Sequence, residues 1–213
     1  MYLSTVIRTV PDFPKPGILF RDITPLLNEP AAFRAALDGL AALVRGVPCD
    51  RLAALESRGF LFAAPLARQW GKGLVAMRKP GKLPADTVAE SYALEYGTAT
   101  LEVHRDAIAP GERVLIVDDL LATGGTAAAA AALVRRLGGS VAGHLFLVEL
   151  EGLGGASAWP ATPCFRLSNF GSTAGCRFRP SPVQRNGLAR RDRSDPIRLQ
   201  ALERTGYPSS SAG

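Results

Sequence analysis

Short apolar runs alternate along the chain with longer segments in which apolar residues recur every three or four positions. The short runs predict buried strands, and the recurring pattern predicts amphipathic helices over residues 30–46, over residues 60–70 and through the alanine tract that reaches residue 132. Strands that alternate with helices in this way indicate an α/β fold with a parallel sheet. The predicted strands are residues 51–55, 73–77, 113–117, 140–150 and 162–167.

Three further segments depart from this alternation. Residues 87–92 and 98–103 alternate apolar and polar side chains, which predicts an antiparallel hairpin of the kind that forms a flap over a site. Residues 12–27 combine three prolines and a glycine with many apolar residues, so we expect an ordered, partly buried loop without a regular helix. Such a loop is a candidate for function or for a packed N-terminal arm or subunit contact. Residues 2–10 are expected to form a short helix.

Charge is distributed unevenly along the chain, whose formal net charge is +6. Residues 171–213 hold eight of the 25 Lys and Arg residues but only three of the 19 Asp and Glu residues. Large apolar side chains are sparse in this segment, which predicts a disordered, solvated tail. A nucleic acid or an acidic protein is the less favoured alternative partner for its charge. We therefore expect one domain over residues 1–170 and a basic tail over residues 171–213.

The three cysteines, Cys49, Cys164 and Cys176, lack the paired spacing of a zinc site. An odd number of cysteines without such spacing predicts free thiols in a reducing compartment. The chain shows neither a secretory signal nor an apolar stretch long enough to span a bilayer. These features predict a cytoplasmic protein that has no membrane partner.

The stretch from residue 113 to residue 132 concentrates the candidate chemistry. Its apolar strand is followed by Asp118 and Asp119, by a turn that contains Gly124 and Gly125, and by a helix. Backbone N–H groups of such a turn and the positive end of the helix dipole favour a phosphate. The two carboxylates suit the hydroxyls of an attached sugar or a metal ion. The P-loop and dinucleotide-binding motifs are both absent. The alternative is a plain strand-to-helix turn in which Gly124 and Gly125 serve only the backbone geometry.

Two other predicted strands also end in polar residues. Residues 51–55 are followed by Glu56, Ser57, Arg58 and Gly59, and residues 73–77 are followed by a cationic turn over 78–82. Ligands of open α/β sheets lie beyond the carboxyl ends of the strands, so we expect residues 56–59 to lie near residues 118–126. Arg58 is then a candidate anion clamp. The cationic turn is either another anion-facing strand end or a solvated basic turn, and taken alone it favours the solvated turn.

Residues 113–126 closely resemble the phosphoribosyl diphosphate signature of the type I phosphoribosyltransferases, which is a hydrophobic strand, Asp-Asp, two residues and Ala-Thr-Gly-Gly-Thr. Five segments together are similar in order and spacing to the adenine phosphoribosyltransferase family, over about residues 8–168. These segments read DFPKPGILFRDITPLL, ESRGFLFAAPLA, MRKPGKLP, SYALEYG and VDDLLATGGT.

The resemblance implies a reaction and a fold. The reaction transfers a phosphoribosyl group from 5-phosphoribosyl 1-diphosphate to adenine, giving AMP and pyrophosphate, and serves purine salvage. It implies Mg²⁺ as cofactor, carried mainly by the diphosphate and the ribose hydroxyls and not by protein ligands. It also implies a homodimer and the type I fold, in which a five-stranded parallel sheet flanked by helices lies under a small N-terminal hood and a flap hairpin.

The resemblance further implies roles for individual residues. Asp118 and Asp119 contact the ribose hydroxyls. Residues 56–59 form the diphosphate loop, which carries a cis peptide bond in relatives. Cations that meet the diphosphate, in part from the neighbouring subunit, are Arg78, Lys79 and Lys82. The base lies against Ile18, Leu19, Phe20 and Arg21. The 5-phosphate is held by Ala122, Thr123, Gly124, Gly125 and Thr126.

Catalysis is assigned to three residues on the same basis. Glu95 is the candidate that takes or hydrogen-bonds a purine ring proton as the nitrogen attacks. Tyr96 is expected to close over the site from the flap, and Arg58 is expected to stabilise the leaving diphosphate. Two alternatives remain: a phosphoribosyltransferase for another purine base, and a non-catalytic diphosphate sensor of the same fold.

Overall fold

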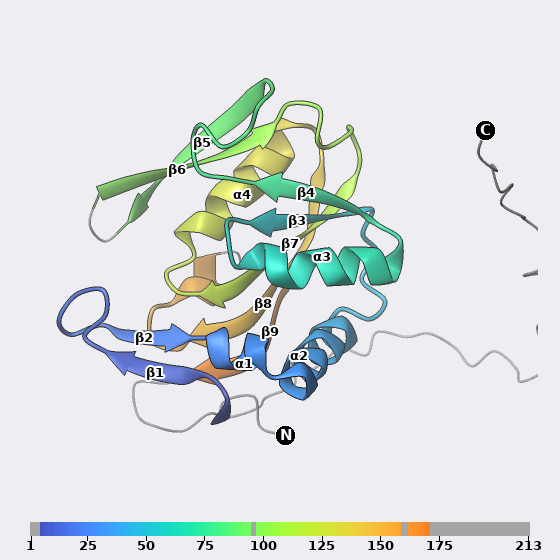
Figure 1. Ribbon diagram of the computed structural model, residues 1–213. Coiled ribbons are helices and arrows are strands. Elements are labelled where there is room, and N and C mark those ends of the chain that lie inside the picture. The colour runs from blue at the N-terminus through green and yellow to red at the C-terminus, as the bar shows by residue number, and fades with distance from the viewer. Residues whose placement is uncertain (1–4, 95–96, 159–161, 171–213) are drawn as a thin grey trace, which may run out of the picture. The chain divides into compact units, whose positions relative to one another are not determined.

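The computed structural model describes residues 5–94, 97–158 and 162–170, and its centre is a parallel sheet of five strands (Figure 1). The strand order is β4-β3-β7-β8-β9, and every neighbouring pair is parallel. This arrangement confirms the predicted α/β class and all five predicted strands. The strands are β3 (Arg51–Leu55), β4 (Gly73–Met77), β7 (Arg113–Leu121), β8 (Ser140–Leu150) and β9 (Cys164–Phe170).

Helices cover both faces of the sheet because the apolar strands present side chains alternately to each side. Leu52 and Leu115 pack in the core shared with α2 (Pro30–Leu43) and α3 (Gly59–Trp70). Val114 and Ile116 pack in the second core, beneath α4 (Gly125–Arg136). Strands buried on both faces explain the continuous apolar runs in the sequence.

The strand order reverses between β3 and β7. The chain passes from β3 through α3 to β4 on one side, and later returns to place β7 on the other side of β3. The connections that follow β3 and β7 therefore leave the sheet in opposite directions and open a crevice at the carboxyl ends of these two strands. Ligand sites of open α/β sheets lie at such points.

Two antiparallel hairpins project at this carboxyl edge, beyond the tips of the sheet arrows in Figure 1. The hood hairpin, drawn in blue, pairs β1 (Arg8–Pro11) with β2 (Leu19–Asp22) and leads into the short helix α1 (Thr24–Asn28). The second hairpin, drawn in green, pairs β5 (Thr87–Leu94) with β6 (Gly97–His104) and confirms the hairpin predicted from alternation. A short 3₁₀ helix, η2 (Gly155–Ala158), follows β8.

Three local expectations were wrong. The predicted helix over residues 2–10 is contradicted by β1, because pairing with β2 extends this segment. The segment 12–27 is not a loop throughout, since it contains β2 and α1. The strand predicted to end at residue 117 continues to Leu121, because the eleven-residue β8 supplies hydrogen-bonding partners along its length. Asp118 and Asp119 consequently lie within β7.

None of the described helices combines the length and the apolar character needed to cross a membrane.

Candidate active site

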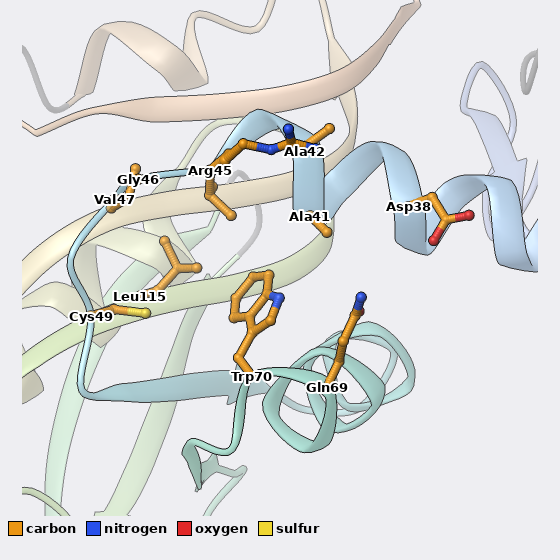
Figure 2. A pocket seen from close by; sticks show the side chains of 11 residues that line it. Asp38, Ala41, Ala42, Arg45, Gly46, Val47, Cys49, Gln69, Trp70 and Leu115 are labelled. Atoms are coloured by element: carbon orange, nitrogen blue, oxygen red, sulfur yellow. The ribbon is translucent and has the colours of Figure 1, made fainter. Parts of the chain in front are cut away.

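Two cavities lie at opposite ends of the parallel strands. The larger, of about 570 Å³, lies between the last turns of α2 and α3, where Trp70 and Leu115 point into the space (Figure 2). It contains none of the predicted site residues. The smaller, of about 390 Å³, lies at the carboxyl ends of β3 and β7 and is lined by most of the predicted anion-binding segments. We therefore place the candidate site in the smaller cavity, on the identity of its lining residues and not on its size.

Two loops that are far apart in the sequence meet in this cavity. The loop after β3 contributes Glu56, Ser57 and Arg58, and β7 with its following turn contributes residues 118–127. The Nε atom of Arg58 lies 2.9 Å from Oδ2 of Asp119. The expected proximity of residues 56–59 to residues 118–126 is thereby confirmed.

Gly59 permits this close approach. A Cβ atom at residue 59 would lie 2.7 Å from the carbonyl oxygen of Val117 and 3.1 Å from Oδ1 of Asp118. A contact as short as the one with the Val117 carbonyl oxygen is not tolerated, so glycine at residue 59 lets the start of α3 pack against the end of β7. The Glu56–Ser57 peptide bond in the adjoining loop is cis.

In the acid pair Asp119 is buried, Asp118 is half-buried, and the Arg58 guanidinium lies beside the pair. Asp119 is 2% exposed, and its Oδ2 atom accepts no hydrogen bond of good geometry within the described part of the chain, although Arg58 lies beside it. Burial and the neighbouring Asp119 carboxylate raise the pKa of Asp118 well above its usual value. Burial also raises the pKa of Asp119, with Arg58 acting in the opposite direction. Hydroxyl donors or a cation from a ligand would stabilise both carboxylates.

The turn after β7 provides donors for an anion. Gly124 has a φ of +88°, a conformation that L side chains rarely adopt, and it immediately precedes α4. No described side chain caps this end of α4, and its first turn holds no acidic residue. The first N–H groups of a helix lack partners within the helix, so this terminus suits a phosphate. Lining residues from the turn are Ala122, Thr123, Gly124, Gly125 and Thr126.

Only one of the three predicted diphosphate cations lines the cavity in the described structure, namely Lys79. Arg78 is held by Glu56, with Nε 3.2 Å from Oε2, and also donates to the carbonyl oxygen of Lys82. The backbone N–H of Lys79 donates to Glu56, and this bond together with Arg78 lowers the pKa of the Glu56 carboxyl. Roles of Arg78 and Lys82 in diphosphate binding stay predictions.

The predicted base loop is in the hood, and none of its four residues belongs to the described lining of the cavity. Phe20 connects the hood to the site, because the Arg58 guanidinium carbon lies 5.5 Å from the centre of its ring. Ile18 and Leu19 are exposed, Leu19 by 52%, and so present apolar surface at the carboxyl edge. Arg21 instead hydrogen-bonds Thr9 and lies over the Phe170 ring at 4.4 Å. Its side chain therefore supports the hood.

Two predicted catalytic residues, Glu95 and Tyr96, lie outside the described residues.

The structure adds a residue that sequence reasoning missed. Tyr92 of β5 lines the cavity, and its hydroxyl accepts a hydrogen bond of 3.1 Å from Oγ1 of Thr126. Alternation along β5 places Tyr92 on the same side of the strand as the buried Val88, which was the available signal. Ala99 of β6 and the buried Phe146 of β8 also line the cavity and had no such signal.

The chain is similar in sequence to proteins of one family. Residues 37–167 match the family described as Phosphoribosyl transferase domain. The chain is 52% identical over 170 residues to the adenine phosphoribosyltransferase of Synechococcus sp., covering 80% of this chain and 99% of that protein. It is 59% identical over 153 residues to the adenine phosphoribosyltransferase of Thermobifida fusca, covering 72% and 87% respectively.

The chain is also similar in fold to solved structures of adenine phosphoribosyltransferases. The crystal structure of adenine phosphoribosyltransferase from Thermoanaerobacter pseudethanolicus superposes with a TM-score of 0.77 at 51% identity, covering 79% of this chain and 98% of that one. The enzyme from Saccharomyces cerevisiae, solved with an imino-altritol bisphosphate and adenine, superposes with a TM-score of 0.72 at 40% identity, covering 77% and 95%. The sequence comparison and the structure comparison thus point to the same kind of enzyme.

Proposed function

The chain belongs to the adenine phosphoribosyltransferase family, and from this premise we propose that it transfers the phosphoribosyl group of 5-phosphoribosyl 1-diphosphate to adenine, releasing AMP and pyrophosphate. One observation carries the proposal: a single cavity unites the loop at residues 56–58, the acid pair and the uncapped start of α4. These parts suit the diphosphate, the ribose and the 5-phosphate of one donor molecule.

The phosphate and the ribose are assigned to the fixed parts of the site. Backbone N–H groups at the start of α4 and the Thr123 and Thr126 hydroxyls would hold the 5-phosphate. Asp118 and Asp119 would accept from the ribose hydroxyls, which supplies a donor to Oδ2 of Asp119. The anomeric carbon then lies between the acid pair and the residue 56–58 loop.

The leaving diphosphate gains negative charge as the anomeric C–O bond breaks. Arg58 and Lys79 line the cavity and would stabilise that charge, so alignment and electrostatics supply most of the catalysis. Adenine attacks from the hood side, against the apolar surface of Ile18, Leu19 and Phe20. We propose that Glu95 takes or hydrogen-bonds the proton of the purine ring and that Tyr96 shields the site from water.

Mg²⁺ is the proposed cofactor. The described ranges contain no group of three or more His, Cys, Asp or Glu residues placed to hold a metal ion. Mg²⁺ commonly binds through substrate phosphates with one or two carboxylates nearby, and the acid pair fits that arrangement through the ribose hydroxyls. When bound, the ion offsets charge on the diphosphate.

A cytoplasmic homodimer is proposed as the working form. Leu61 on α3 and Leu74 on the edge strand β4 are each 42% exposed and are available to a subunit contact. Sedimentation equilibrium checks the proposal, with an expected mass of twice the 22.5 kDa chain.

The activity is tested by supplying adenine, hypoxanthine and guanine separately, each with the diphosphate donor and Mg²⁺. We expect AMP from adenine and no comparable product from the other bases.

Arg58→Ala is expected to lower turnover about 100-fold, because it removes a charged donor to the leaving group. Arg45→Ala, an exposed arginine at the other cavity, makes the same charge change and should have no effect. Absence of AMP with wild-type protein would reject the proposal.

A further inference from the structure

The hydroxyl of Tyr92 contacts Thr126, one of the residues of the proposed phosphate site. It accepts the hydrogen bond of Thr126 Oγ1 at 3.1 Å, and both residues line the same cavity. The tyrosine ring is partly buried against the core beneath α4. Tyr92 thus brings one polar atom from the β5–β6 hairpin to the start of α4, 34 residues further along the chain.

Strand β5 is attached to α4 at both ends of the helix. At the far end, Arg136 donates to the carbonyl oxygen of Ala89 at 2.7 Å and to Oε2 of Glu90 at 2.8 Å. At the near end, Thr126 contacts Tyr92. Because the helix holds the strand at two points, the Tyr92 hydroxyl has a defined position relative to the phosphate-binding turn.

We propose that Tyr92 is a positioning residue for the donor's 5-phosphate and acts through the hydroxyl of Thr126. This inference rests on the proposed function. A threonine hydroxyl can donate one hydrogen bond, and without a ligand Thr126 donates it to the Tyr92 hydroxyl. When the Thr126 O–H instead donates to a phosphate oxygen, Thr126 Oγ1 can accept a hydrogen bond from the Tyr92 hydroxyl. The resulting chain runs from Tyr92 through Thr126 to the phosphate, and each bond polarises the next.

Tyr92→Phe tests this series of hydrogen bonds, because it keeps the ring and removes only the hydroxyl. Calorimetric titration with 5-phosphoribosyl 1-diphosphate and Mg²⁺, without adenine, measures donor binding separately from turnover. We expect affinity to fall about tenfold, the upper range for the loss of one hydrogen bond between neutral hydroxyls, with the KM for adenine unchanged. Ser91→Ala is the matched control, since it removes a neighbouring hydroxyl that bonds Thr100 on β6; it should leave donor affinity unchanged.

A double-mutant cycle shows whether Tyr92 acts through Thr126. Thr126→Ala should weaken donor binding, and adding Tyr92→Phe to it should have no further effect. Thr126→Ser keeps the hydroxyl, so in that background Tyr92→Phe should again cost about tenfold in affinity. If folded Tyr92→Phe protein binds the donor with wild-type affinity, or if the losses of affinity in Tyr92→Phe and Thr126→Ala add in the double mutant, this inference is wrong while the proposed function stands. Failure of the wild-type protein to bind the donor would reject the proposed function and this inference with it.

Discussion

At the residue scale, Asp118 and Asp119 lower the folding stability of the protein but suit the binding of a sugar. A half-buried carboxylate and a buried one stand next to each other, and the guanidinium of Arg58 lies beside them. Repulsion and lost hydration disfavour the doubly ionised state. The same properties make the pair a strong acceptor for sugar hydroxyls.

Asp118→Asn separates the two effects. The pKa of Asp118 is raised in the folded protein, so its ionisation destabilises the fold progressively as pH rises above the unfolded value of about 3.8. Removing the charge should therefore raise the urea midpoint at pH 7 while weakening donor binding by about tenfold or more. Asp38→Asn, at the other cavity, is the control and should change neither property. Lower stability of Asp118→Asn would contradict this account.

The buried His144 should make the folding stability of the protein fall at acid pH. It is fully buried on β8, and burial together with the charge of Arg135 lowers its pKa to about 4. The unfolded chain binds a proton near pH 6.5 and the folded one does not, so stability present above pH 6.5 is lost as pH falls toward 4. The expected loss is about 3 kcal/mol.

Urea unfolding between pH 4 and pH 7 measures this loss. The pH dependence should become shallower in His144→Asn, whatever that substitution costs at pH 7, and should be retained in His104→Asn. An unchanged slope in His144→Asn would assign the acid sensitivity to other groups.

At the element scale, the site depends on how closely α3 approaches β7. Gly59→Ala should force the two apart, because the new methyl group meets the backbone oxygen of Val117. We expect loss of about 1–3 kcal/mol of stability, as for other overpacked sites, and a fall in kcat/KM of at least about tenfold from misplacement of residues 56–58.

Gly73→Ala provides the matched control at the opposite end of the same β-α-β unit. Its added methyl group meets the terminal Nη1 atom of Arg51, which belongs to a flexible side chain and can move away. Activity should remain at the wild-type level. Equal effects of the two substitutions on kcat/KM would argue against the role given to Gly59.

Elements were predictable where the signal is local. Continuous apolar runs between turn residues located β3, β4 and β8 at their observed bounds. The N-terminal segment was mispredicted because β1 forms only by pairing with β2, whose register depends on a proline-rich turn that periodicity does not describe. The end of β7 was misplaced because its last residues are extended by pairing with β8.

At the scale of the whole molecule, the family match ends at residue 167, the Synechococcus relative is covered over 99% of its length by 170 aligned residues, and large apolar side chains are sparse in residues 171–213. We therefore propose that the basic segment 171–213 is dispensable for catalysis. A chain truncated after Phe170 should match the full chain in kcat/KM and melting temperature. A substantial loss in either would assign the tail a part in folding or binding.

The sequence by itself determined the α/β class, the order of the strands and helices in the parallel-sheet core, and the proximity of residues 56–59 to residues 118–126. Apolar periodicity, turn glycines and the polar residues that end strands are local properties, and the rule for parallel sheets brings those ends to one edge. Tertiary structure alone decided which side chains line the cavity. Arg78 is held by Glu56, Arg21 supports the hood, and Tyr92 reaches Thr126. Such contacts join residues distant in the chain, so they depend on strand register and helix packing, which no local pattern encodes.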